Sequence, residues 1–213
     1  GGQDGLVNVL GVILGVAAAT NDPRIVLVAG LAATFAESVS MGAVAFTSTL
    51  ADADFYESER SREYRHIQQV PHLEKNEVRE IYQEKGFKGE LLDRIVDTIT
   101  ANKDVWVAVM MAEEHQLQPT NRKEAIRSAL VVGFAAIVGS LIPLVPFAFL
   151  PVSMSMFASV AVTAVVLFGV GAYKAQKTVG HPGKSGLEMA AIGTLSALVG
   201  YVVGALLKIP PTP

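Results

Sequence analysis

The sequence of 213 residues contains no cysteine and few charged residues. Without cysteine, the chain has neither a disulfide framework nor a thiolate metal site. Charged residues make up 17% of the chain, whereas soluble globular domains carry roughly a quarter. The net charge of −3 also excludes a basic nucleic-acid-binding protein. Hydrophobic residues reach 51% and the mean hydropathy is +0.40, which excludes a disordered chain and an ordinary soluble domain.

Several motifs of enzymes and ATP-driven pumps are missing as well. The sequence contains no Walker A loop, no GxGxxG and no HExxH, and it supports no Ser/His/Asp arrangement. We therefore do not expect an enzyme. Any transport by this chain would be passive or driven by an ion gradient, because no ATP-binding motif is present.

The charges that are present are unevenly placed. Of 37 formal charges, 26 lie between Asp52 and Lys123, and the other 141 residues share 11. This distribution indicates a membrane protein that carries one polar module over residues 52–123.

Long uncharged runs on either side of that module predict membrane-spanning helices, which need about 20 mostly apolar residues each. The run of 46 uncharged residues from Ser128 to Tyr173 is too long for one helix and contains three prolines, so we divide it in two. The five predicted spans are Leu6–Thr20, Ile25–Leu50, about 124–143, about 151–175 and about 185–207.

The expected fold is therefore all-α, with five transmembrane helices and an inserted helical module. Residues 1–51 hold helices 1 and 2, residues 52–123 the module, and residues 124–213 helices 3 to 5. The chain starts at Gly1 without methionine, and we expect the first span to begin upstream, with Asp4 inside the membrane or at its edge. Lysine and arginine are more frequent on the side of the module, which predicts a cytoplasmic module.

Two GxxxG pairs suggest close helix packing. Gly11 and Gly15 lie in the first span, and Gly200 and Gly204 lie in the last. Small residues at this spacing let helix backbones approach closely, within a chain or in a dimer. The alternative is that glycine is simply common in membrane helices.

The module reads as four short helical segments. Residues 52–70 continue from the second span, and Val70-Pro71 breaks that helix. Glu74–Glu84, Leu91–Ala101 and Val105–Leu117 are the further predicted helices.

One carboxylate interrupts an apolar span. Glu37 lies in the second span, and Met41 follows one turn later on the same face. An intramembrane carboxylate is costly and is a functional-site hypothesis by default. The structural alternative is a protonated Glu37 that hydrogen-bonds to a neighbouring helix.

The module holds further candidate metal ligands. Glu63 and His66 are three residues apart, as are Glu74 and Glu77, so each pair shares a helix face. Met110 and Met111 precede Glu114 at helical spacing. Carboxylate and imidazole suit divalent metals, and a thioether favours softer transition metals. The alternatives are a solvated acidic face and core methionines. The four histidines are scattered along the sequence, and we assign no chemistry to the turn that contains His181.

Several of these features occur together, in the same order, in a known family. The matching motifs are Asp4-Gly5-Leu6, Ser40-Met41-Gly42, Val70-Pro71, Glu74-x-x-Glu77-Val78-x-Glu80-Ile81, Met110-Met111-x-x-Glu114 and Pro143-Leu144-Val145-Pro146. With these motifs, nearly the whole chain resembles the vacuolar iron transporter family.

The resemblance implies a function. Family members are homodimers with five transmembrane helices per subunit, embedded in lipid. They move Fe²⁺, and often Mn²⁺ and other divalent metals such as Co²⁺ or Zn²⁺, out of the cytosol in exchange for protons. The resemblance places the path at the dimer interface, along spans 1 and 2, and has the cytoplasmic module capture metal. No cofactor is implied beyond the metal that is bound or transported.

The resemblance also implies roles for residues. The pathway acid falls on Asp4 and the pathway thioether on Met41. The module ligands fall on Glu63, His66, Glu74, Glu77, Met110, Met111 and Glu114. There are two departures from the family pattern. His66 stands where glutamate is usual, and the second acid of span 2 falls on Ala33. Whether Glu37, one turn further on, takes over that role is left open by the sequence.

Two other functions remain compatible with these residues. The protein could be a membrane-anchored metal sensor or buffer that binds metal without transporting it. The acidic module could also recruit a protein partner to a structural dimer. The sequence does not distinguish a plasma membrane from a vacuole-type membrane.

Overall fold

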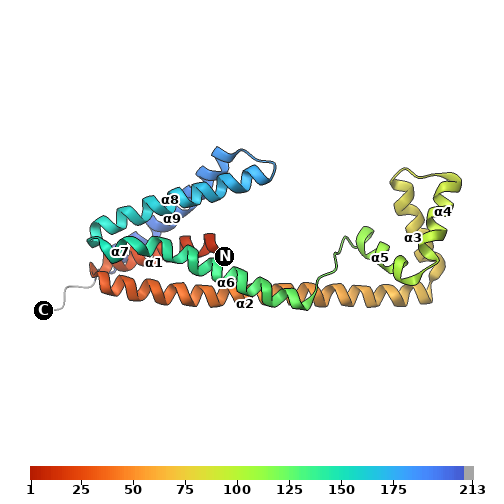
Figure 1. Cartoon of the computed structure of the whole chain (residues 1–213), viewed down its shortest axis with the longest axis horizontal. Coiled ribbons are helices and arrows are strands. Elements are labelled where there is room, and N and C mark those ends of the chain that lie inside the picture. Colours follow the sequence, from red (N-terminus) through yellow and green to blue (C-terminus); the bar gives the residue numbers. More distant parts are fainter. Residues whose placement is uncertain (209–213) are drawn as a thin grey trace. The chain divides into compact units, whose positions relative to one another are not determined.

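The computed structural model describes residues 1–208, and within that range every element is helical and none is a strand (Figure 1). In order, the elements are α1 (Gly2–Thr20), α2 (Pro23–Gln69), α3 (Pro71–Glu84), α4 (Gly89–Thr100), α5 (Lys103–Glu113), α6 (Arg122–Leu141), η1 (Ile142–Leu144), α7 (Val145–Phe149), α8 (Val152–Lys177) and α9 (Pro182–Leu206). Five stretches among residues 1–208 are long and apolar enough to cross a membrane. They are α1, α2, α6 together with α7, α8, and α9. The all-α class is confirmed, and the chain is an integral membrane protein.

The helices form two compact units. The membrane unit consists of Gly1–Ala45 and the chain from Arg127 onward, and the polar unit is Phe46–Ile126. The predicted module of residues 52–123 lies inside the polar unit. As predicted, α2 continues out of its apolar part without a break as far as Gln69 (Figure 1).

A tight turn joins α1 to α2 and makes them antiparallel neighbours. Asn21 ends α1 in the left-handed conformation (φ 49°), which asparagine tolerates better than most residues. The Asp22 carboxylate then accepts a 2.8 Å hydrogen bond from the backbone N–H of Arg24. Pro23 occupies the first position of α2, where its missing N–H costs nothing. Each residue of the turn thus either ends one helix or starts the next.

The two GxxxG pairs pack against each other inside the subunit. A Cβ added to Gly200 would collide with the carbonyl oxygen of Gly11, and one on Gly204 would collide with that of Gly15. Hydrogen at these positions therefore lets the backbones of α1 and α9 touch. The close packing considered for these glycines is present, and its partners are α1 and α9 of one chain.

The proline segment stays helical where a clear break was expected. After α6, the chain passes through the 3-10 turn η1 and the short α7, which contain Pro143 and Pro146. Two buried serines of α8 donate hydrogen bonds to carbonyl groups of this segment. The Ser159 hydroxyl donates to the Pro143 carbonyl over 2.6 Å, and the Ser155 hydroxyl donates to the Pro146 carbonyl over 3.1 Å. Such side-chain bonds allow proline inside a membrane segment.

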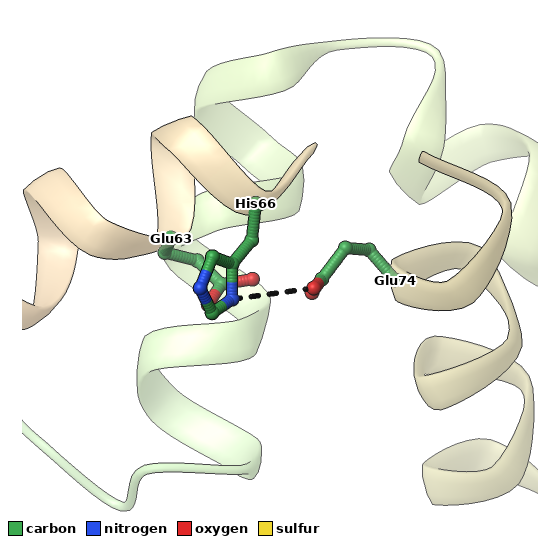
Figure 2. A group of neighbouring side chains, drawn as sticks. All are labelled: Glu63, His66 and Glu74. Carbon is green, nitrogen blue, oxygen red and sulfur yellow. Dashed lines mark ion pairs between the residues drawn. The ribbon is translucent and has the colours of Figure 1, made fainter. Parts of the chain in front are cut away.

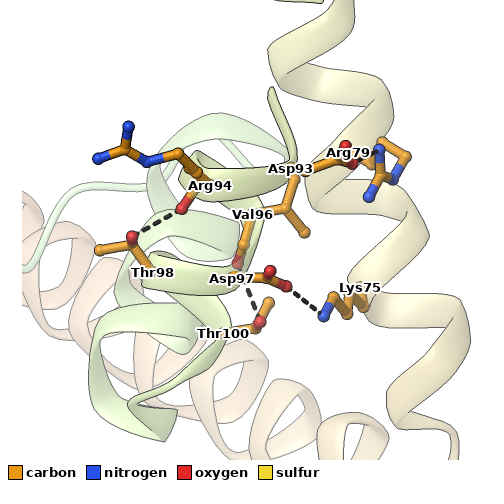
Figure 3. A network of polar contacts seen from close by, with 8 residues as sticks. All are labelled: Lys75, Arg79, Asp93, Arg94, Val96, Asp97, Thr98 and Thr100. Atoms are coloured by element: carbon orange, nitrogen blue, oxygen red, sulfur yellow. Dashed lines mark hydrogen bonds and ion pairs between the residues drawn. The ribbon is translucent and has the colours of Figure 1, made fainter. Parts of the chain in front are cut away.

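The polar unit has its own apolar core. Its buried members come from α2, α3, α4 and α5, and they are Ile67, Val78, Leu92, Val96, Ile99, Trp106, Val107, Met110 and Met111. On the surface, Lys75 and Arg79 of α3 pair with Asp97 and Asp93 of α4 over 2.7 and 2.6 Å (Figure 3). Apolar burial supplies most of the stability, while exposed pairs of this kind contribute little.

The last helix of the polar unit ends earlier than predicted. The expected helix Val105–Leu117 is α5, which ends at Glu113. Gln116 adopts the left-handed conformation (φ 54°), and the Leu117 N–H reaches back to the Met111 carbonyl over 2.9 Å. The chain thus reverses through a residue in the left-handed conformation, which glycine usually occupies. Glutamine gives no such signal in the sequence.

Candidate metal sites in the membrane helices and the polar module

Glu37 makes a hydrogen bond to a neighbouring helix. The Asn8 side-chain nitrogen of α1 donates to Glu37 Oε1 of α2 over 2.9 Å. Glu37 is half-buried and Asn8 is exposed, so the pair lies at the surface of the single subunit. Asn8 was missed by the sequence reasoning. The available signal was an amide within the otherwise apolar run of residues 6–20.

The antiparallel register relates this pair to Asp4 and Met41. Asp4 precedes Asn8 by one turn on α1, and Met41 follows Glu37 by one turn on α2. Since the helices run in opposite directions, both residues belong to the level next to the Asn8–Glu37 bond, about 6 Å along the helix axis. Asp4 is exposed and Met41 is half-buried. Oxygen and sulfur donors are thus available at two successive levels of one helix pair.

In the polar unit, the break after α2 turns α3 back so that three predicted ligands meet (Figure 2). His66 Nδ1 lies 3.5 Å from Glu74 Oε1, and Glu63 lies beside them. One ligand atom from each of the three residues lies within 4.8 Å of the others. Glu63 is 2% exposed and Glu74 4%. This group will be called the α2–α3 cluster.

The buried carboxylates are incompletely satisfied. Within residues 1–208, Glu63 Oε1 and Glu74 Oε2 are buried and have no hydrogen-bond partner. Burial raises the pKa of the Glu74 carboxyl above its ordinary value, and the neighbouring Glu63 raises it further. Burial also raises the pKa of the Glu77 carboxyl, and the negative charge of the neighbouring Glu74 raises it further. A divalent cation would supply the positive charge and the coordination that these oxygens lack.

A second group of donors shares Glu63. His115 Nε2 lies 3.4 Å from Glu63 Oε2 and 4.0 Å from Glu114 Oε2. Ligand atoms of the three residues again lie within 4.8 Å of one another. Sequence reasoning placed Glu63 and Glu114 among the ligands but left His115 unassigned. The available signal was its position directly after Glu114.

Met110 and Met111 have a structural role in the polar unit. Both side chains are fully buried among the apolar residues of α2, α3, α4 and α5. Thioether ligation by these residues stays a prediction, as does ligation by Glu77.

Comparisons with known proteins agree with this architecture. The model of the VIT family matches residues 1–205. "Vacuolar iron transporter 1" of Oryza sativa subsp. japonica is 33% identical over 202 residues, which cover 94% of this chain and 80% of that relative. "Vacuolar iron transporter 1" of Arabidopsis thaliana is 31% identical over 209 residues, covering 98% of this chain and 84% of the relative.

The similarity extends beyond plants. "Vacuolar iron transporter" of Plasmodium falciparum (isolate 3D7) is 29% identical over 218 residues, covering 98% of this chain and 80% of the relative. The family match spans both the membrane unit and the polar unit. On this evidence, the chain belongs to the VIT family.

Proposed function

We propose that this protein transports divalent metal, Fe²⁺ and Mn²⁺ in particular, out of the cytosol in exchange for protons. It works as a homodimer, with the polar unit on the cytoplasmic side and the receiving side either a vacuole-type compartment or the cell exterior. The relatives named as iron transporters support metal as the cargo. The asymmetry of lysine and arginine supports the orientation.

The observation that carries the proposal is the polar pair inside an apolar helix hairpin. Glu37 lies in a span of high hydropathy, and its carboxylate accepts a hydrogen bond from Asn8 of the neighbouring helix. Such a carboxylate is expensive to keep in a membrane unless a function requires it. With Asp4 and Met41 at the next level, a partly dehydrated cation can step between weak sites and still leave.

Exchange with protons follows from carboxylate chemistry. A cation and protons compete for the same oxygens, so metal release on one side is favoured when the carboxylates are protonated there. In the polar unit, the pKa values of Glu74 and Glu77 are raised above the ordinary value, so protons compete with metal for these carboxylates at a higher pH than for an ordinary glutamate. The α2–α3 cluster would concentrate metal before it enters the membrane path.

A membrane-anchored metal buffer is the second candidate. The unsatisfied oxygens of Glu63 and Glu74 fit metal binding equally well in a protein that does not transport. Glu37 is the feature that a buffer does not need. Flux therefore separates the two functions.

The test is uptake of Fe²⁺ by liposomes that contain the purified protein and have an acidic interior. We expect flux that stops on Glu37→Ala or Met41→Ala and is only weakened by Glu74→Ala. The matched control is Glu188→Ala, which removes an exposed carboxylate of α9 that pairs with Lys184. Full flux in the Met41 variant would remove the proposed path, and metal binding without any flux would establish the buffer.

A further inference from the structure

The end of α5 positions His115 beside Glu63 and Glu114, the other two members of the second donor group. Its backbone N–H donates to the Met110 carbonyl over 3.2 Å, and the following residues reverse the chain through the left-handed Gln116. Leu117, at the end of this reversal, packs against the apolar core of the polar unit. The imidazole is therefore positioned by backbone hydrogen bonds and by packing. Its side chain is only 15% exposed.

The imidazole points at a carboxylate with unused capacity. Glu63 is 2% exposed, and while its Oε2 lies 3.4 Å from His115, its Oε1 is buried without a partner among residues 1–208. Glu114, 42% exposed at its side chain, closes the group from the solvent side. One nitrogen and two or more oxygens thus converge where a buried polar atom still lacks a partner.

These donors define a chemical class of ligand. Mg²⁺ and Ca²⁺ take oxygen ligands, whereas imidazole nitrogen suits first-row transition metals. A neutral imidazole also adds coordination without adding negative charge, which limits how tightly a hard cation is held. The position of His115 accordingly favours Fe²⁺, Mn²⁺, Co²⁺ or Zn²⁺ over the abundant Mg²⁺.

We propose that His115 is a metal ligand that completes a site with Glu63 and Glu114 and selects transition metals over Mg²⁺ in the polar unit. This deepens the proposed function and rests on it for the identity of the cargo. Glu63 is common to this site and to the α2–α3 cluster, so occupation of one position affects the other through a shared carboxylate.

The test uses the full-length protein in detergent with Mn²⁺ as the probe and pulsed electron paramagnetic resonance as the readout. Nitrogen that is bound to Mn²⁺ gives hyperfine couplings, and histidine is the source of such nitrogen here. In a His66→Gln background, we expect the couplings to persist, because His115 still ligates. Adding His115→Gln should abolish them and weaken Mn²⁺ binding at least about tenfold. Adding His72→Gln, which removes an exposed imidazole of the same unit, should change neither.

A further variant covers the case in which the glutamine substitution disturbs the fold. In the same background, His115→Glu replaces the nitrogen by an oxygen ligand, so Mn²⁺ binding should be retained while the couplings disappear and selectivity over Mg²⁺ falls. Emission of Trp106, the only tryptophan, reports whether the polar unit remains folded. Couplings that vanish with His66→Gln alone, or that survive removal of His115, would overturn the assignment. Because the readout is the bound metal, absence of flux in liposomes would refute the transport function and leave this result intact.

Discussion

The Asn8 side chain donates a 2.9 Å hydrogen bond to Glu37, and this bond joins α1 to α2 inside the membrane unit. It gives the carboxylate a fixed direction on the face that also carries Asp4 and Met41. The amide donates without adding charge, so the carboxylate keeps its capacity to bind a cation. Asn8 is thus a positioning residue for the proposed path.

Replacing Asn8 should weaken transport without changing the fold. In Asn8→Val, Glu37 loses a hydrogen bond of a kind worth about 1.5–3 kcal/mol when one partner is charged, and we expect the KM for Fe²⁺ or Mn²⁺ flux to rise about tenfold. The measurement is initial uptake by liposomes over a range of metal concentrations. Thr194→Val is the control, because the Thr194 hydroxyl donates to the Ala190 carbonyl of its own helix. An unchanged KM in Asn8→Val would show that Glu37 is positioned without it.

Enlarging Gly200 should destabilise the membrane unit. A side chain there would collide with the Gly11 backbone, which cannot move aside without displacing α1. We expect Gly200→Ala to cost about 1–3 kcal/mol and to lower the midpoint of thermal unfolding in detergent by several degrees. Gly169→Ala is the matched control, since nothing within the described chain lies within 4 Å of a Cβ at Gly169. Equal stability of the two variants would contradict the close contact between α1 and α9.

Raising the pH should reduce the stability of the metal-free polar unit through Glu74. Its pKa in the folded protein is above the ordinary value of 4.5, so between these two values the folded state binds more protons than the unfolded state. The stabilising contribution is complete below about pH 4.5 and is lost as the pH rises through the raised pKa. In Glu74→Gln this loss is absent, so the stability of the variant relative to the parent protein should increase with pH.

Emission of Trp106 during denaturant unfolding, with a chelator present, measures that difference. Adding Mn²⁺ to the parent protein should restore the stability lost at higher pH, because the cation replaces the protons. The same addition should have a smaller effect on Glu74→Gln. A stability difference that does not vary with pH would show that burial of Glu74 costs nothing on ionisation.

The contribution of Asp97 to stability should change with pH in the opposite direction to that of Glu74. Its hydrogen bond with Lys75 lowers the pKa of the Asp97 carboxyl below the ordinary value of 3.8. The resulting contribution is present above that ordinary value and is lost as the pH falls through the lowered pKa. Asp97→Asn should therefore leave the dependence of unfolding free energy on pH unchanged above pH 5. In acid, the variant should lose slightly less stability than the parent protein. The pair is exposed (Figure 3), so a large effect near neutral pH would contradict its role as a surface contact.

Periodicity and proline placement predicted most of the fold, because these signals are local. The unbroken α2 and its end before Pro71 followed from the absence of glycine and proline over residues 52–70. The early end of α5 did not, since it depends on Gln116 in a conformation that glycine usually marks. The hydrogen bonds from serine hydroxyls of α8 to the carbonyl groups of Pro143 and Pro146 arise from helix packing, which no local pattern reveals.

The candidate sites likewise combine features that local spacing predicted with contacts that arise only when the chain folds. The spacing of Glu63 and His66 placed both on one helix face, but their meeting with Glu74 requires the chain reversal at Pro71. His115 was missed because it reaches Glu63 only through the irregular end of α5. Asn8 was missed because one amide barely changes the hydropathy of an apolar run. Residues brought together by a reversal or by helix packing leave little trace in sequence spacing.

The contact between α1 and α9 has a consequence for how the protein is made. The glycines of α1 find their closest partners, Gly200 and Gly204, in α9, which is synthesised long after α1. Until α9 has been inserted, the helix that carries Asp4 and Asn8 lacks its tightest neighbour. Chains that stop before Gly200 should therefore be open to quality-control proteases, and assembly of the path would wait until α9 has been made and inserted.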